Sequence, residues 1–550
     1  MRAPACFTTH TVVNQPPPLP VHDAWAADRP LREAVARAGG AWAQAELSAY
    51  GQRVGGDLPE LARLANAQKP QLRTHDRYGH RIDEVEFHPA YHQLMAAAVA
   101  GGVVNFSWRH RDRAGAHVAR AALAWLHYQT DHGSSCPLTM THACVPALQQ
   151  APELAAAWLP RILAPHYDPR HVPAWDKPGN TVGMGMTEKQ GGSDVRANST
   201  RATSIGDGMY ELVGHKWFLS APMSDAFLVT AQTPAGVGCF LLPRFAPDGT
   251  RNGMRLQRLK DKLGDWSNAS SEVEFAGALA WPVGEEGRGI ATILDMVGLT
   301  RLDCAVASAS LMRQALVQAL HHCRHRHAFG QVLLEQPLMR GVLADLALEV
   351  EAATALAFRI ARAVDAAARD AHEAALARIA TAIGKYWICK RAPGFVNEAQ
   401  ECLGGAGYIE ESLMPRLYRQ APVNSIWEGS GNLLCLDVLR ALRREPECRQ
   451  ALNDELARVR GQHPALDAAL AEVAHLLAAD ADAQQAQARR LVERSALCLQ
   501  AGLLFAAGLD AIAASWCASR LGGEGGLVYG ALPVDAPQAQ LLMRAWDGVA

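Results

Sequence analysis

Apolar positions with a helical period dominate the first third of the chain. Residues 31–163 contain alanine-rich amphipathic runs such as Val118–Leu126, and almost no segments in which apolar and polar residues alternate. Residues 1–30 differ because prolines cluster between positions 16 and 20. We therefore expect an extended arm over residues 1–30, followed by an N-terminal helical domain over residues 31–180.

The pattern changes near Asp176. From there to Pro282 glycines become frequent, and short β-like segments appear at Tyr210–Val213, Phe227–Ala231, Cys239–Leu242 and Val273–Phe275. Turn residues separate these segments, at Gly206-Asp207-Gly208 and Pro247-Asp248-Gly249. We expect an antiparallel β domain of about a hundred residues, over 181–290.

The helical period returns at Gly289. Apolar residues from Leu338 to Val350 recur four positions apart on one face. Pro446 predicts a stop for these helices, and alanine- and leucine-rich helices resume after it. We expect a helical bundle over residues 291–445 and an extra helical domain over 446–550, which makes the fold class α+β.

Composition narrows the class of protein. At 550 residues the chain is long enough for three or four domains. Its net charge of −2 carries no overall signature of a nucleic-acid partner, and no long apolar stretch indicates a membrane span or a secretory signal. The twelve cysteines form no CxxC pairs, which favours free thiols in the cytoplasm over zinc ligands or disulfides.

Three segments carry candidate chemistry. The first, from Met184 to Val195, reads MGMTEKQGGSDV and is expected to be a loop. Its adjacent glycines would let backbone N–H groups approach a phosphate or the polar edge of a flavin, although such a sequence also suits an ordinary turn.

The second segment, from Gly214 to Ser220, reads GHKWFLS. Its aromatic pair and serine on a short strand could stack against a planar ring and bond its edge, or could belong to a core strand.

The third segment, from Asn424 to Asn432, reads NSIWEGSGN and precedes an apolar helical run. The start of that helix could receive a phosphate or an electron-rich flavin. Glu428 follows Ile426 and Trp427, and a carboxylate in such an apolar niche can act as a base. A capped helix start with a solvated glutamate is the alternative interpretation.

Taken together and in order, these segments resemble signatures of the acyl-CoA dehydrogenase superfamily. TEKQGGSDV resembles its T-E-x-x-x-G-S-D signature, and GHKWFLS is similar to its flavin-edge strand. The segment from Arg326 to Gln336 resembles its R-x-x-F-G…Q pattern, GGAGY at 404–408 its G-G-x-G-Y, and WEG at 427–429 its base motif. The proline arm, RLKDKLGDWSNAS and PVNSIWEGSGN are similar to the AidB branch of alkylation-response flavoproteins, which carries an extra C-terminal helical domain.

The resemblance implies an FAD cofactor and names the residues that would hold it. The loop and strand contacts would be Met184, Gly185, Met186, Thr187, Glu188, Lys189, Gln190, Gly191, Gly192, Ser193, Phe218, Leu219 and Ser220. The segment that closes over the cofactor would include Ile426, Trp427, Gly429, Ser430, Gly431 and Asn432. The contacts to FAD held by a neighbouring subunit would be Arg326, Phe329, Gln336, Gly404 and Gly405. Sharing of this kind implies a homotetramer.

The resemblance also implies the reaction, α,β-dehydrogenation of an acyl-CoA. Glu428 stands in the commonest base position of the family, and Thr300 occupies the second base position, where a hydroxyl cannot serve. Leu434-Cys435 replace a frequent Gln-Arg pair, which argues against a pocket suited to an ordinary acyl-CoA. The first function hypothesis is a slow dehydrogenase of a short or branched acyl-CoA.

The rival hypothesis is a DNA-associated protein that protects against alkylation damage and in which FAD is largely structural. Residues 445–550 contain 8 arginines, no lysine and 13 acidic residues, a net charge of −5. We therefore expect DNA binding, if present, to be weak and non-specific, although Arg489, Arg490 and Arg494 could cluster on one helical face.

Overall fold

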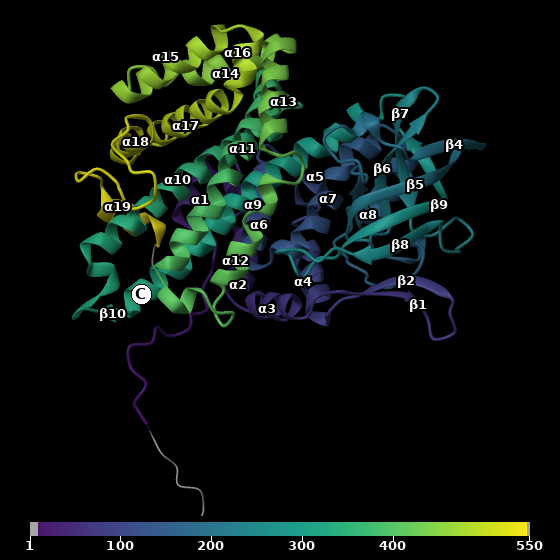
Figure 1. The fold of residues 1–550 in the computed structure, drawn as a ribbon, viewed down its shortest axis with the longest axis horizontal. Coiled ribbons are helices and arrows are strands. Elements are labelled where there is room, and N and C mark those ends of the chain that lie inside the picture. The colour runs from purple at the N-terminus through teal and green to yellow at the C-terminus, as the bar shows by residue number, and fades with distance from the viewer. Residues whose placement is uncertain (1–8, 547–550) are drawn as a thin grey trace, which may run out of the picture.

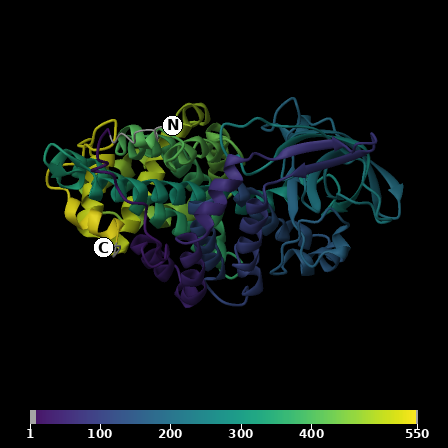
Figure 2. The ribbon, with the colours of Figure 1, turned by 90° about the horizontal axis from the view of Figure 1, so that it is seen from below.

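The computed structural model describes residues 9–546 as a helical body with a β-sheet at one end (Figure 1). A view from below shows the same two parts side by side (Figure 2). Among the described residues, no helix has both the length and the apolar character needed to cross a membrane.

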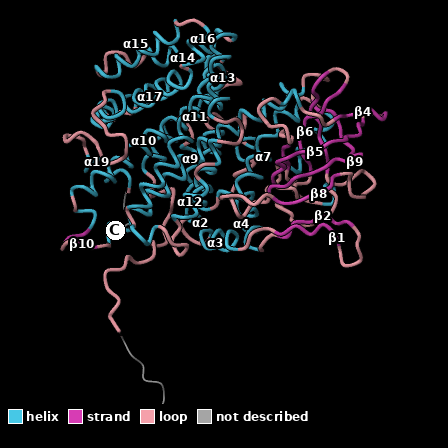
Figure 3. The backbone as a smooth tube through the Cα atoms, in the orientation of Figure 1, coloured by secondary structure: helices cyan, strands magenta, loops and turns pink. Residues whose placement is uncertain are grey.

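The N-terminal region is helical, as expected, but it is interrupted by a β-hairpin. Its helices are α1 (Arg29–Arg37), α2 (Gln44–Val54), α3 (Leu58–Ala67), α4 (Pro89–Ala100), α5 (Phe106–Arg109), α6 (Ala116–Thr130), α7 (His132–Gln149) and α8 (Pro152–Ile162). The hairpin pairs β1 (Gln71–His75) with β2 (Arg81–Glu86). The expectation of almost no strand here was wrong, because this short, charged hairpin has no strong apolar alternation and packs beside the main sheet (Figure 3).

The middle region forms a seven-stranded sheet. Its strands are β3 (Val182–Gly185), β4 (Arg201–Gly206), β5 (Met209–Ser220), β6 (Ala226–Thr233), β7 (Gly236–Pro243), β8 (Met254–Leu259) and β9 (Ser270–Val283). All four β-like segments of the sequence lie in strands. Most neighbours are antiparallel, but β3 runs parallel to β6. The expected antiparallel sheet thus includes a parallel pair, since strand direction depends on how the chain returns to the sheet.

The bundle consists of long helices that run away from the sheet. They are α9 (Gly289–His325), α10 (Pro337–Ala366), α11 (Ala371–Glu401), α12 (Met414–Gln420) and α13 (Gly431–Arg444), with the small hairpin β10 (His327–Ala328) and β11 (Gln331–Val332) at the far end of α9. The last helices are α14 (Pro446–Ala457), α15 (Pro464–Ala478), α16 (Ala481–Ala486), α17 (Ala488–Ala506), α18 (Asp510–Trp516) and α19 (Gln538–Ala545). They pack on α10, α11 and α13 (Figure 1).

Two apolar clusters determine where the candidate site lies. The larger one joins the N-terminal helices, the bundle and the C-terminal helices into a continuous core. The second joins α7 and α9 to strands β3, β6 and β7, and Trp427 packs against it. The sheet is thus fixed to the bundle next to the loop that carries Glu428.

Candidate active site

Glu428 lies on a strained loop between a short turn and α13. Its φ of 58° is in the left-handed region, which costs a non-glycine residue about 1–3 kcal/mol, and Gly429 follows with a φ of 102°. The three consecutive carbonyls of this loop are all bound by cations. Lys385 Nζ donates to Trp427 O at 2.5 Å and to Gly429 O at 2.6 Å, and Arg301 Nε donates to Glu428 O at 2.9 Å. These bonds offset the strain and hold the carboxylate in one place.

Both cations are themselves held by the bundle. Lys385 is fully buried in α11. The residues on both sides of it in the helix are buried as well. Arg301 of α9 pairs with Asp437 of α13 at 2.8 Å, and Arg378 pairs with the same carboxylate. Burial raises the pKa of Asp437, but the bonds and charges of Arg378 and Arg301 outweigh it and leave the pKa lowered. The position of Glu428 therefore depends on two helices distant in sequence, α9 and α11, and on α13, which follows it directly.

Among residues 9–546, one side chain bonds directly to the carboxylate of Glu428, because Thr300 Oγ1 donates to its Oε2 at 2.7 Å. Thr300 and Glu428 are the residues that the family resemblance assigns to its two base positions, and the fold brings them into contact. The thiol of Cys136 in α7 bonds to Ser220 and lies close to Glu428. Burial raises the pKa of this thiol to about 12, so it stays protonated. The Cys136 thiol is therefore not a second base at neutral pH.

A polar network fixes Trp427 beside this carboxylate. Trp427 Nε1 donates to Asn424 Oδ1, and the Asn424 amide donates to the Nε2 of His132, each at 2.9 Å. The His132 Nδ1 faces Asp265 Oδ1 at 2.9 Å, and the His132 and Trp427 rings stack 6.1 Å apart. Burial would lower the pKa of His132, but the Asp265 carboxylate and its hydrogen bond raise it above the usual value. No motif in the sequence pointed to His132, and Asp265 stood within the segment RLKDKLGDWSNAS without a role assigned to it.

The second predicted segment, from Gly214 to Ser220, lies in strand β5. Leu219 is buried, whereas the neighbouring Phe218 is 51% exposed, as the alternation of a strand requires. Ser220 Oγ contacts Ser270 Oγ at 3.0 Å. Lys260 lies 4.5 Å from the Phe218 ring centre, a cation that the sequence analysis missed. An exposed aromatic ring next to a hydroxyl is the arrangement that a planar heterocycle can bind.

The first predicted segment divides into strand and loop. Met184 and Gly185 are buried in β3, so the expectation that the whole segment is a loop was wrong for them. The loop begins at Met186, and its solvent-exposed residues are Lys189, Gln190, Gly191, Gly192 and Ser193. An added Cβ at Gly191 would meet no atom within 4 Å, so this backbone is open to a ligand.

Glu188 has a structural role within this segment. Its buried carboxylate accepts from Lys216 Nζ at 2.9 Å and from Ser199 N at 2.6 Å. Burial opposes ionisation, but Lys216 and these hydrogen bonds lower its pKa to about 2. The carboxylate is therefore occupied by protein partners, and it fixes the loop to β5. Thr187, one residue earlier, accepts at its carbonyl from Trp217 N at 2.8 Å.

The remaining predicted cofactor residues lie at the far end of α9. Arg326 is about 26 residues beyond Thr300, which corresponds to about 39 Å along a helix. There Arg326 Nη1 donates to Asn14 O of the N-terminal arm at 2.6 Å, and Gln336 Nε2 donates to Ala328 O. Gly404 and Gly405 begin the turn after α11, and Cys402 O just before them accepts from Cys323 at 3.8 Å. Within one chain, the predicted cofactor residues therefore lie in two groups that are far apart.

Both groups suit parts of FAD. The group near Glu428 offers a half-exposed aromatic ring, hydroxyls and the open backbone at Gly191 for a flavin. The distant group offers Arg326 and two glycines, Gly404 and Gly405, where an added Cβ would meet nothing within 4 Å. This donor set fits a nucleotide with a flat ring at one end and phosphates behind it.

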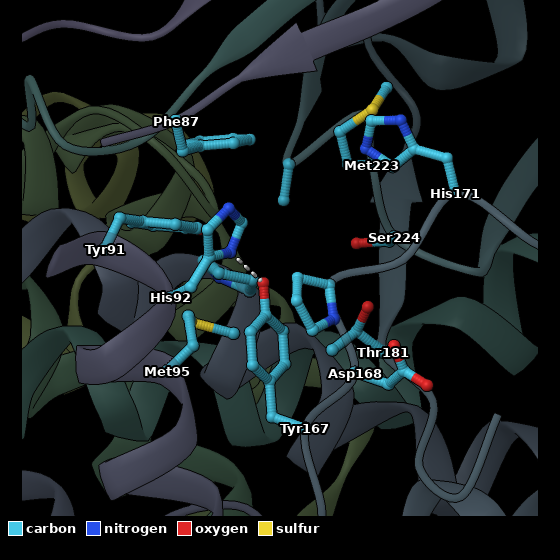
Figure 4. A pocket seen from close by; sticks show the side chains of 13 residues that line it. Phe87, Tyr91, His92, Met95, Tyr167, Asp168, His171, Thr181, Met223 and Ser224 are labelled. Atoms are coloured by element: carbon cyan, nitrogen blue, oxygen red, sulfur yellow. Dashed lines mark hydrogen bonds between the residues drawn. The ribbon is translucent and has the colours of Figure 1, made fainter. Parts of the chain in front are cut away.

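A small cavity of about 30 Å³ lies behind the flavin-edge strand, next to Ala221 (Figure 4). Phe87, Tyr91 and Tyr167 surround it, and the Ser224 hydroxyl faces into it without a protein partner. Its volume suits molecules the size of water and is too small for an acyl chain.

The site and fold together define a class, flavin-dependent dehydrogenases with a helical–β–helical architecture. Three family patterns match the chain: the AidB N-terminal domain at residues 14–169, the acyl-CoA dehydrogenase middle domain at 183–278 and its C-terminal domain at 287–443. AidB of Escherichia coli (strain K12) is 48% identical over 548 residues, 99% of either chain. Acyl-CoA dehydrogenase family member 11 of Caenorhabditis elegans is 33% identical over 433 residues, 75% of this chain and 69% of that protein.

Solved structures of similar fold lead to the same family. The crystal structure of Caenorhabditis elegans ACDH-11 in complex with C11-CoA has a TM-score of 0.86 at 26% identity, and covers 99% of this chain and 93% of its own. The apo-form of Bd2924 has a TM-score of 0.83 at 28% identity, and covers 91% of this chain and 100% of its own. The chain belongs to the acyl-CoA dehydrogenase family, in the AidB branch.

Proposed function

We propose that this protein is an FAD-dependent dehydrogenase that introduces an α,β double bond into an acyl-CoA. FAD supplies the hydride acceptor when it is bound. Glu428 removes the α-proton, because its carboxylate is held beside the flavin-edge strand by the Lys385 and Arg301 bonds to its own loop. That constrained carboxylate is the observation that carries the proposal.

We propose a short or branched acyl group. Trp427, Met186 and Leu299 are bulky side chains that pack against the apolar cluster adjoining the base loop, which favours a compact substrate. Leu434 and Cys435, at the position where relatives often carry Gln-Arg, are both buried in α13 and offer no charge to a ligand.

The test is an anaerobic titration of the purified yellow protein with a panel of acyl-CoA thioesters. We expect about one FAD per chain and bleaching of the flavin by at least one short or branched thioester. Glu428→Gln should retain FAD and slow bleaching by about 10²–10⁴-fold, the usual contribution of a general base. The control is Glu401→Gln, an exposed carboxylate that bonds only to Asn397 among the described residues. Undiminished bleaching in Glu428→Gln would remove Glu428 from the mechanism.

We also propose that the protein is a homotetramer in which each FAD contacts two chains. The 39 Å separation of the two residue groups, about 26 residues of α9, supports this arrangement. Large apolar side chains near the distant group are exposed, with Phe329 at 99%, Leu338 at 84% and Tyr408 at 83%, as expected of a surface that another chain covers. Arg326→Ala should release FAD more readily without unfolding the chain.

A cytoplasmic location is consistent with the eleven cysteines of residues 9–546, which are all buried and unpaired. DNA binding would be weak. Of the three arginines that could cluster on α17, Arg490 and Arg494 are both paired with Glu472.

A further inference from the structure

Arg244, the residue after strand β7, carries a buried guanidinium without an ion pair. The residue is 8% exposed. In the part of the chain that the structure describes, it forms no salt bridge, and neither its Nε nor its Nη2 has a hydrogen-bond partner. Its Nη1 donates to a weak acceptor, the thioether sulfur of Met223, at 3.2 Å. Burying a charge in this way is costly unless a counter-charge meets it.

The carboxylates around Arg244 are already bound by other cations. Asp225 pairs with Lys177 at 2.7 Å, and Glu84 pairs with Arg251 at 2.6 Å. Burial lowers the pKa of Arg244, and the attraction of Asp225 does not outweigh that effect. Three cations thus accompany two carboxylates, and the positive charge of Arg244 is the one left over.

Arg244 lies next to the cavity of about 30 Å³ that Figure 4 shows. Met223, which accepts its Nη1 bond, lines that cavity. His171 lines it too, and its pKa is lowered first by burial and then by the charge of Arg244. The Ser224 hydroxyl, in a residue 3% exposed, faces into the same cavity without a protein partner. Space for about two water molecules also accommodates an anion of about three or four non-hydrogen atoms.

We propose that Arg244 and Ser224 bind a small planar oxyanion, of the size of formate or bicarbonate, in this cavity. The Nε and Nη2 hydrogens lie along one edge of a guanidinium, and that edge matches two oxygens of a carboxylate. Arg53 binds Asp57 through the same two nitrogens, at 3.1 and 2.6 Å. The Ser224 hydroxyl supplies a further donor to the anion, which neutralises the guanidinium.

The site lies behind the turn that follows the flavin-edge strand. Ala221 lines the cavity directly after Ser220, and its φ of 50° is in the left-handed region. Ser224 belongs to the same turn, because its N–H donates to Ala221 O at 2.9 Å. An anion held by Ser224 therefore stabilises this turn. The site contains no residue of the proposed reaction, so the inference does not depend on the dehydrogenase proposal.

The experiment is equilibrium dialysis of the purified holoprotein with radiolabelled formate and, separately, radiolabelled bicarbonate, at constant ionic strength in sodium chloride. We expect about one saturable site per chain for at least one of the two anions, and the tighter of them identifies the ligand. Propionate, which is too large for the cavity, should not compete. Absence of saturable binding by both anions, or displacement by propionate, would overturn the inference.

Three variants test the residues. Arg244→Lys keeps the charge but lacks the two-nitrogen edge, and Ser224→Ala removes the hydroxyl. Each should weaken anion binding about tenfold to a hundredfold, the range for a lost hydrogen bond to a charged group. Arg251→Lys, at the arginine paired with Glu84, is the control and should bind as the wild type does.

Urea denaturation checks that each variant is folded. The bound anion should raise the urea midpoint of the wild type and of Arg251→Lys, but not that of Arg244→Lys. If Arg244→Lys does not fold, Ser224→Ala decides the question alone. Unchanged binding in the folded Arg244 or Ser224 variant would overturn the inference. Equal weakening in Arg251→Lys would do the same, because it would show general attraction to positive charge.

Discussion

Thr300 donates a hydrogen bond from its hydroxyl to the carboxylate of Glu428 at 2.7 Å, although 128 positions separate the two residues. The hydroxyl is shared, since it also donates to Val297 O at 3.1 Å within α9. In the proposed reaction, a side chain that cannot act as a base thus orients Glu428, the proposed base. Thr300 is a positioning residue.

Thr300→Val keeps the shape of the side chain and removes this bond. We expect flavin reduction by the best thioester to slow about tenfold to a hundredfold, the equivalent of a hydrogen bond to a charged group, with FAD affinity unchanged. Stopped-flow absorbance of the flavin measures the rate. Thr300→Ser, which restores the hydroxyl, should recover most of it, and a valine variant as fast as the wild type would show that the bond has no role.

Lys385→Met tests whether the buried ammonium holds the base loop. The variant leaves the carbonyls of Trp427 and Gly429 without their partner, so we expect a loss of about 1–3 kcal/mol in the free energy of unfolding. Urea denaturation measures it, with Lys69→Met at an exposed pair as the control. Because the loop is strained, flavin reduction should slow by a larger factor than in the Thr300 variant. Unchanged stability would show that other contacts hold the loop.

Asp265→Asn should change the pH dependence of stability. The folded-state pKa of His132 is raised, because Asp265 outweighs the effect of burial, so its stabilising contribution is complete below the unfolded pKa of about 6.5 and is lost as pH rises through the folded pKa. The variant should therefore lose more stability at pH 6 than at pH 9 relative to the wild type.

Other buried histidines have the opposite effect on the pH dependence of stability. Burial lowers the pKa of His117 and of His127 to about 4, so the stabilisation that comes from keeping them neutral is lost as pH falls from about 6.5 towards 4. Unfolding curves of both proteins from pH 6 to pH 9 isolate His132 by difference. A constant difference across that range would contradict the assignment.

DNA binding should be weak and should respond to the charge of α17. We expect the intact protein to bind duplex DNA at about 50 mM salt at most, and to lose that binding by about 200 mM. Glu472→Gln frees Arg490 and Arg494 and should strengthen binding at low salt. Tight binding by the unaltered protein at the higher salt, or no response to Glu472→Gln, would overturn this interpretation.

The helical and β-rich regions, and the residues of the base motif, were evident in the sequence because periodicity and turn chemistry are properties of a few neighbouring residues. Glu428, Phe218 and Ser220 lie where the motifs placed them relative to their own elements. The β1–β2 hairpin could not be predicted in this way, because its charged strands lack a local apolar pattern. The parallel pairing of β3 with β6 depends on the path of the chain between them, which no local pattern reports.

The partners of these residues were decided by tertiary packing alone. In the sequence Lys385 is an ordinary helix residue and Thr300 only a position where a base is missing. Their contacts with the base loop depend on how α9 and α11 pack against that loop. Glu188 stood within a motif typical of cofactor contacts, yet its carboxylate is used by Lys216 in the core. In the sequence Arg489 is one of three surface arginines, and its contact with α13 depends on how α17 packs on that helix. A sequence determines which chemical groups are present, but which of them touch depends on contacts between segments that lie far apart in the chain.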